Sequence, residues 1–151
     1  MSYCTSRKEL LRIVLDTSVI IAAFRSRRGA SRRVVDLFDQ GQYLLLLSPA
    51  LLLEYEAVLT RPNQMEAHGT TVEQIGEFFE EVAARSVHVT MHFQWRPQLV
   101  DPGDEFVLET AINGYADAIV THNTAHFVDA AARFGIDVLS PGRTIEKEPV
   151  R

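Results

Sequence analysis

Three carboxylates stand at positions where a strand-like or helix-like pattern begins, ends or breaks. Asp16 directly follows the apolar run "LRIVL", Glu54 interrupts the apolar pattern of "PALLLEYEAVL", and Asp104 follows the turn-like "DPG". Carboxylates that are brought together repel one another unless a cation lies among them. Oxygen ligands favour hard cations such as Mg²⁺ or Mn²⁺, and these ions activate water and stabilise charge in phosphoryl transfer. If the fold gathers these side chains, we expect a metal site for phosphodiester chemistry.

Each of the three acids also has a common structural explanation. An Asp after a strand is usually a turn residue, and an Asp at the start of a helix is usually its N-cap. A Glu within a helix is usually a surface residue or an ion-pair partner. The hypothesis of a metal site therefore depends on the combination of Asp16, Glu54 and Asp104 in chain order, each on a suitable element.

The elements that must position these acids alternate between strand-like and helix-like patterns. Short apolar runs bounded by turn residues predict strands, and apolar residues at helical spacing predict helices. The expected strands are residues 11–15, 43–47, 87–91, 118–121 and 137–139. The expected helices are 18–24, a segment capped by Ser31 and ended by Gly41, 49–59, 72–85, a segment opened by Asp104, and 125–134. This alternation predicts a three-layer α/β/α domain with a parallel central sheet, in which sites lie at the carboxyl ends of the strands.

Length, charge and cysteine content narrow the possible function classes. The 151 residues fit one domain, which we expect at 11–141, between an N-terminal lead (1–10) and a polar C-terminal tail (142–151). The net charge of -5 argues against a protein that coats nucleic acid by bulk electrostatics, but it is compatible with an acidic site that has a basic rim. Cys4 is the single cysteine, which excludes a disulfide framework and favours the reducing cytoplasm. Neither a membrane span nor a secretory signal is expected, because no apolar run has the required length.

Four segments in chain order resemble the motifs of the PIN domain, the nuclease domain named after the PilT N-terminus. These segments are "IVLDTSV" (13–19), "LSPALLLEYEAVLTRP" (47–62), "DPGDEFVLETA" (101–111) and "ADAIVTHN" (116–123). The resemblance extends over nearly the whole chain, from about Leu11 to Pro141. The resemblance is strongest to the bacterial PIN proteins that are toxin components of toxin–antitoxin systems, relatives of the VapC ribonucleases.

The resemblance implies a Mg²⁺- or Mn²⁺-dependent ribonuclease in which Asp16, Glu54 and Asp104 are the acidic metal ligands. Asn123 stands at the position of the family's fourth acid. Its amide oxygen can still bind a metal, but it removes one negative charge, so a second metal should bind more weakly than the first. Asp117 matches a further acid that is common in this group, and we expect it to be structural because it stands at the head of its strand.

Polar side chains around the acids are candidate contacts for an RNA substrate. We expect such contacts from Ser18, Thr121, Arg25, Arg27 and Arg28. The arginines belong to "RSRRGASRR", and the planar guanidinium group suits phosphate. A solvated loop, or an anchor for the acidic tail of a partner, explains this arginine-rich segment equally well.

Two further features have weaker functional interpretations. His122 and His126 have the spacing of a helical metal pair, but no third ligand stands nearby, so we do not expect a zinc site. His126 stands near the place where some PIN relatives have an acid, which makes it a candidate for contact with substrate. Trp95 has the ring to stack on a base, but packing against the sheet is the favoured interpretation.

The resemblance also implies a homodimer and a small antitoxin protein that blocks the site. The main alternative to a ribonuclease is a PIN fold, weakened at Asn123, that binds RNA or a protein partner without cleavage. A small α/β phosphatase or nucleotide-binding enzyme is the remaining alternative. It ranks last because "LDTSV" has neither the phosphate-cradling glycines nor the second Asp that such an enzyme needs.

Overall fold

The computed structural model describes residues 10–92, 99 and 101–147, which form a parallel sheet between layers of helices. The strands are β1 (Leu11–Leu15), β2 (Tyr43–Leu47), β3 (Val87–His88), β4 (Ala118–Val120) and β5 (Asp137–Leu139). The helices are α1 (Thr17–Arg25), α2 (Ala30–Asp39), α3 (Pro49–Leu59), α4 (Pro62–His68), α5 (Val72–Arg85), α6 (Pro102–Asn113), α7 (Thr124–Ala132) and α8 (Pro141–Lys147).

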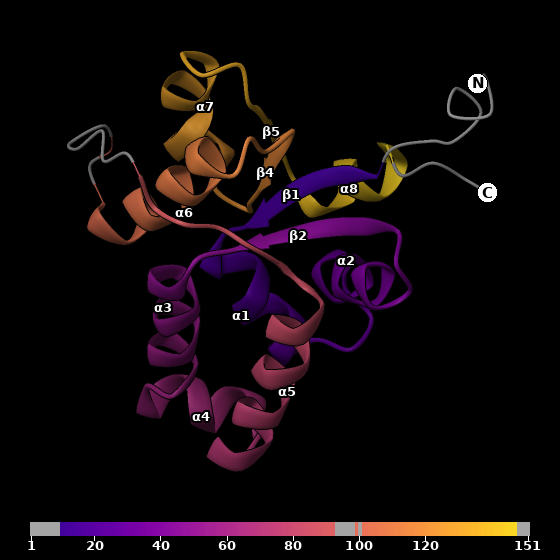
Figure 1. Ribbon diagram of the computed structural model, residues 1–151. Helices are drawn as coiled ribbons and strands as arrows, with labels where there is room; N and C mark the ends of the chain where they lie inside the picture. The colour runs from indigo at the N-terminus through magenta and orange to yellow at the C-terminus, as the bar shows by residue number, and fades with distance from the viewer. Residues whose placement is uncertain (1–9, 93–98, 100, 148–151) are drawn as a thin grey trace.

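The sheet has the strand order β3-β2-β1-β4-β5, and every neighbouring pair of strands is parallel. From β1 the chain passes through β2 to β3 in one direction, and it then crosses back over the sheet to β4 and β5. Right-handed crossovers therefore place α1 to α5 on one face of the sheet and α6 and α7 on the other (Figure 1). The predicted three-layer α/β/α fold is confirmed.

The strands are buried because both faces of the sheet are covered. Ile13, Val14 and Leu15 of β1 are almost completely inaccessible to solvent, as are Ile119 and Val120 of the neighbouring β4. Such continuous apolar runs are typical of parallel strands in α/β proteins. Together with the apolar faces of the helices they form one hydrophobic core, and this core fixes the carboxyl ends of β1 and β4 side by side.

The order of the strands reverses between β1 and β4, which makes this point the topological switch of the sheet. The chain continues from the ends of β1 and β4 onto opposite faces of the sheet, so a crevice lies between the two carboxyl ends. Open α/β sheets bind their ligands in such a crevice. Asp16 directly follows β1 and Thr121 directly follows β4, so both residues lie at the switch point.

The starts of two helices agree with the sequence. Ser48 caps α3 with its side chain, which accepts a hydrogen bond from the backbone N–H of Leu51, and Pro49 occupies the first turn. Thr71 and Gln74 form a complete capping box at the start of α5. These motifs depend on local geometry alone, and the predicted bounds 49–59 and 72–85 are therefore those of the structure.

Two predicted helix starts are wrong. The N-cap of α2 is Gly29, and Ser31, the predicted cap, is buried inside the helix and hydrogen-bonded to His122 at 2.6 Å. The N-cap of α6 is Asp101, whose carboxylate accepts a hydrogen bond from the N–H of Gly103 at 2.8 Å. Asp104 is thus the third residue inside α6, and its carboxylate does not cap the helix.

The remaining differences are short elements. The strand predicted at 87–91 is limited to β3 (Val87–His88), and Pro62 starts α4 after the end of α3. The first residues of the expected polar tail form α8, which packs against α2 and buries Thr144. The division of the chain at residue 141 remains a prediction.

Some of the predictions concern residues that the structure does not describe. Cys4 and Trp95 lie outside the described residues, as does most of the expected N-terminal lead. No helix in the described ranges combines the length and the apolar character needed to cross a bilayer.

Candidate functional site

Asp16 is the central side chain of the switch point. Only 2% of its surface is exposed, and its backbone N–H donates to the carbonyl of Val120, which ties the end of β1 to the end of β4. Its carboxylate atom Oδ2 accepts hydrogen bonds from the hydroxyls of Ser18 and Thr121, both at 2.7 Å. Atom Oδ1 receives one longer bond of 3.4 Å from Thr17. Asp16 is therefore held in one orientation, with most of the capacity of Oδ1 still available.

The two hydroxyls that hold Asp16 are themselves oriented by backbone groups. The N–H of His122 donates to Ser18 Oγ at 3.1 Å, and the N–H of Asn123 donates to Thr121 Oγ1 at 2.9 Å. Because each hydroxyl oxygen accepts one bond, its proton is free to point at Asp16, and the chained bonds reinforce one another. Ser18 and Thr121, predicted as substrate contacts, thus both contact the first predicted metal ligand.

Helix α3 brings Glu54 toward the same edge. The hydroxyl of the neighbouring Tyr55, which is completely buried, donates a short hydrogen bond to the carbonyl of Leu15, so α3 is fixed to the end of β1. Burial, and then the negative charge of Asp16, raise the pKa of Tyr55 well above its ordinary value, so this proton stays in place. Glu54 lies on the adjoining part of the helix, which faces the start of α6.

Gly103 leaves room for Glu54 at the start of α6. A Cβ atom at this position would lie 3.2 Å from Glu54 Oε2 and 3.3 Å from Asp101 Oδ1. The glycine therefore lets two carboxylates approach the first turn of α6, where Asp104 is the next residue. We call the group of Asp16, Glu54, Asp101 and Asp104 the acidic edge.

The negative charges of the acidic edge affect the pKa of Asp104. The pKa of Asp104 is raised from 3.8 to about 6. The largest cause is burial, and the negative charges of Asp16 and Asp101 raise it further. A hydrogen bond and the charge of His126 act in the opposite direction but are outweighed. His126 Nδ1 lies 3.2 Å from Asp104 Oδ2. The carboxylates thus repel one another, and a cation among them would relieve that repulsion.

Because its pKa is raised, Asp104 should make the metal-free protein less stable as the pH rises from about 4 to about 6. In this range the folded protein keeps the Asp104 proton while the unfolded chain has lost it. Asp104→Asn removes the charge, so at about pH 7.5 the variant should be more stable than the wild type by about 2 kcal/mol. Urea unfolding with a chelator at about pH 4.5 and about pH 7.5 measures this difference. An equal difference at both pH values would contradict the assigned cause.

The structure separates the other predicted site residues. The side chain of Asn123 is exposed and makes no capping bond to α7, whereas His126, three residues later, contacts Asp104. Arg25 is exposed and bonds Gln64 of α4, and Arg27 and Arg28 are exposed in the loop before α2. That loop leads to Ser31, which bonds His122 beside the switch point. Arg27 borders a pocket with His68 and Phe78, next to α4 and α5, and the roles of these arginines remain predictions.

Asp117 lies at the opposite end of β4 from the switch point. Its carboxylate accepts a hydrogen bond from the backbone N–H of Arg12 at 2.8 Å, and its backbone bonds Asp137. These contacts join the amino ends of β1, β4 and β5. The expectation that Asp117 is structural agrees with this position.

Two buried acids on α6 were not singled out from the sequence. Glu105 and Glu109 are 4% and 2% exposed, and Glu105 accepts a hydrogen bond from the N–H of Leu99 at 3.0 Å. Both lie among the buried residues of α6. The apolar spacing of this segment predicts a helix but does not reveal the two acids. The signal that was overlooked is a carboxylate at a core position, which needs a polar partner.

The donor chemistry of the acidic edge fits a hard divalent cation. Asp16 Oδ1 has spare acceptor capacity, Glu54 lies against Gly103, and Asp104 is under like-charge repulsion. In the part of the chain that the structure describes, no three His, Cys, Asp or Glu side chains are already placed to hold one ion. Binding therefore requires rotation of side chains on Cα positions that the fold brings together. Glu54 is only half-buried, so its side chain is one that can rotate.

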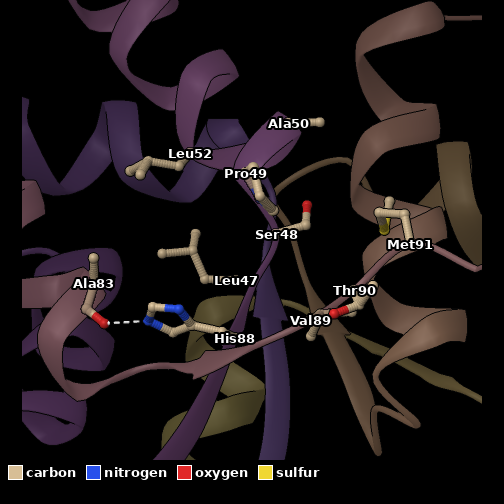
Figure 2. A pocket seen from close by; sticks show the side chains of 10 residues that line it. All are labelled: Leu47, Ser48, Pro49, Ala50, Leu52, Ala83, His88, Val89, Thr90 and Met91. Atoms are coloured by element: carbon tan, nitrogen blue, oxygen red, sulfur yellow. Dashed lines mark hydrogen bonds between the residues drawn. The ribbon is translucent and has the colours of Figure 1, made fainter.

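A large apolar pocket lies elsewhere. It has a volume of about 630 Å³ and is bordered by α3, α5 and the edge strand β3, and it contains none of the acidic-edge residues (Figure 2). Figure 2 shows His88 at its wall, with Nε2 hydrogen-bonded to the carbonyl of Ala83 at 2.7 Å. The other polar side chains that border it are the hydroxyls of Ser48 and Thr90. The acids that could do chemistry are thus at the open switch point and outside this pocket.

Comparisons with known proteins agree with this architecture. A family model described as the PIN domain matches residues 12–125. No curated protein matches the sequence. One similar solved structure is the crystal structure of VapBC2 from Rickettsia felis bound to a DNA fragment from their promoter. The superposition has a TM-score of 0.55 at 12% sequence identity and covers 86% of this chain and 98% of that chain, a likeness that shows a shared fold. Because the family model covers most of the chain, this protein belongs to the PIN domain family.

Proposed function

We propose that this protein is a divalent-metal-dependent endoribonuclease that cleaves RNA phosphodiesters at the acidic edge. The observation that carries the proposal is the interaction of Asp16 with Asp104 at the topological switch point of a PIN fold, with Glu54 beside the adjoining Gly103. The chain presents these acids from the end of β1, from α3 and from α6, which are far apart in sequence. Mutual repulsion of buried acids is destabilising, and a structural role alone does not account for it.

In this proposal Asp16 is the fixed ligand, because two hydroxyls lock its Oδ2 while Oδ1 stays available. Glu54 and Asp104 supply the other carboxylates, and the side chain of Asn123 lies close enough in sequence to Thr121 to add an amide oxygen. When bound, Mg²⁺ or Mn²⁺ supplies an activated water and stabilises negative charge on the phosphate. The acidic edge alone would repel RNA, and the metal ion reverses the local charge.

The RNA backbone is held in this proposal by Arg27 and Arg28, which are exposed in the loop before α2. The net charge of -5 makes such a local basic segment necessary, because the whole molecule does not attract nucleic acid. We further propose that the protein is a homodimeric toxin controlled by a small antitoxin protein. The support for this part is the fold that it shares with a chain of the VapBC2 structure.

The test is cleavage of a mixed-sequence fluorescent RNA by the purified protein during titration with Mn²⁺ and with Mg²⁺. We expect cleavage that depends on the metal and stops when a chelator is added. Tight RNA binding without cleavage at any metal concentration would support a non-cleaving binding module instead. If the protein neither bound a divalent ion nor cleaved RNA, the proposed nuclease would be refuted.

A further inference from the structure

The side chain of α7 that reaches the acidic edge is an imidazole. His126 is the third residue of α7, just as Asp104 is the third residue of α6, and the two helices pack on the same face of the sheet. Both side chains therefore leave the first turn of a helix at the carboxyl edge. They meet with 3.2 Å between His126 Nδ1 and Asp104 Oδ2, and about half of the imidazole surface stays exposed.

The separation of these two atoms fits shared coordination of one ion. Ligand atoms at about 2.1 Å from an octahedral cation lie about 3.0 Å apart when they occupy neighbouring positions. The observed 3.2 Å between Nδ1 and Oδ2 is close to that spacing. Of the two imidazoles at this edge, only that of His126 contacts an acid of the acidic edge, because His122 is bonded to Ser31.

The chemical identity of the fourth donor affects which ion a site prefers. Mg²⁺ is bound in proteins by oxygen ligands and water, whereas an imidazole nitrogen binds first-row transition ions well. A donor set of carboxylates with one imidazole therefore accepts Mn²⁺ with little loss and penalises Mg²⁺. The exposed amide of Asn123 gives no such discrimination, because it offers an oxygen.

We propose that His126 is a nitrogen ligand of the metal site at the acidic edge and makes this site prefer Mn²⁺ to Mg²⁺. This inference rests on the proposed function, since it names a ligand of the same site. In this arrangement Nδ1 faces the ion beside Asp104, and the imidazole proton is carried by Nε2. The alternative is a hydrogen bond from Nδ1 that only orients Asp104, and it predicts that loss of His126 weakens both ions equally.

The experiment measures metal binding by calorimetry and nitrogen coordination by pulsed electron paramagnetic resonance of bound Mn²⁺. The variants are His126→Ala and His126→Asp, and the matched control is His122→Ala, which removes the other imidazole at this edge. We expect the ratio of Mn²⁺ affinity to Mg²⁺ affinity to fall about tenfold in both His126 variants. Nitrogen coupling from a directly bound ligand should be present in the wild type and in His122→Ala, and absent in both His126 variants.

The outcomes separate this inference from the proposed function. Wild-type protein that binds Mn²⁺ through Asp16 but shows no nitrogen coupling would overturn the role of His126 and leave the nuclease proposal standing. An unchanged affinity ratio in His126→Asp would overturn it as well. Absence of divalent-ion binding in the wild type would refute both. Circular dichroism of each variant shows whether α7 is intact, and the exposed position of His126 favours normal folding.

Discussion

Replacing Asp16 by asparagine is expected to reduce metal-dependent RNA cleavage by about a thousandfold, which corresponds to about 4 kcal/mol of transition-state stabilisation. The substitution preserves the shape of the side chain but removes the negative charge that lies at the switch point. With its amide oxygen at the position of Oδ2, the asparagine still accepts from Ser18 and Thr121, but its NH2 group replaces Oδ1, the atom that accepts from Thr17 and has capacity for a metal ion. Single-turnover cleavage at saturating Mn²⁺ measures the loss, and calorimetry measures the accompanying loss of metal affinity.

Asp117→Asn is the matched control for this prediction. It makes the same chemical change in an acid of the same fold, but at the opposite end of β4, where the carboxylate holds the N–H of Arg12. We expect a small loss of stability and an unchanged cleavage rate. Equal activity of Asp16→Asn and the wild type would remove Asp16 from the metal site, and the proposed mechanism would then fail.

The substitution Gly114→Ala should lower the free energy of unfolding by about 2 kcal/mol or more. Gly114 is buried where α6 ends, and a Cβ atom there would lie 2.8 Å from Val89 Cγ2 and 2.9 Å from Leu46 Cδ1. Val89 and Leu46 both belong to the packed core, so neither side chain can move away without colliding with another core residue. Urea unfolding monitored by circular dichroism gives the change directly.

Gly76→Ala is the natural comparison because it adds the same methyl group to a helix that has open space beside it. Gly76 lies inside α5, and a Cβ atom added there would meet nothing within 4 Å beyond its own helical turn. Alanine is favoured over glycine in a helix by roughly 0.5–1 kcal/mol, so this variant should be more stable than the wild type. If the two substitutions changed stability in the same direction, crowding at Gly114 would not be the cause.

Sequence patterns predicted those features of the fold that depend on neighbouring residues. The strands β1 and β2 are continuous apolar runs, and α3 and α5 begin with capping motifs that act within four residues. The parallel sheet followed from the alternation of these elements. Asp16 could be placed at a strand end for the same reason, because the apolar run "LRIVL" stops immediately before it.

Features that depend on contacts between distant segments were not predicted. The pairing of Ser31 with His122 joins α2 to the end of β4, and it overrides the local tendency of serine to cap a helix. The contact between His126 and Asp104 requires the packing of α6 against α7, which spacing along the chain does not reveal. The cap of α6 was missed for another reason: "DPG" reads equally as a turn and as a capped helix start with proline at its first position.

The hydrogen bond between Asp16 and Thr121 joins residues that are 105 positions apart, and this has a consequence for biosynthesis. A nascent chain that has emerged only as far as α6 contains Asp16, Glu54 and Asp104, but it lacks β4, which pairs with β1. Such a chain lacks the Thr121 hydroxyl, one of the two groups that hold Asp16 Oδ2, and the Val120 carbonyl that accepts from the backbone N–H of Asp16. We therefore expect the acidic edge to assemble only late in translation, so that copies that end before β4 are inert.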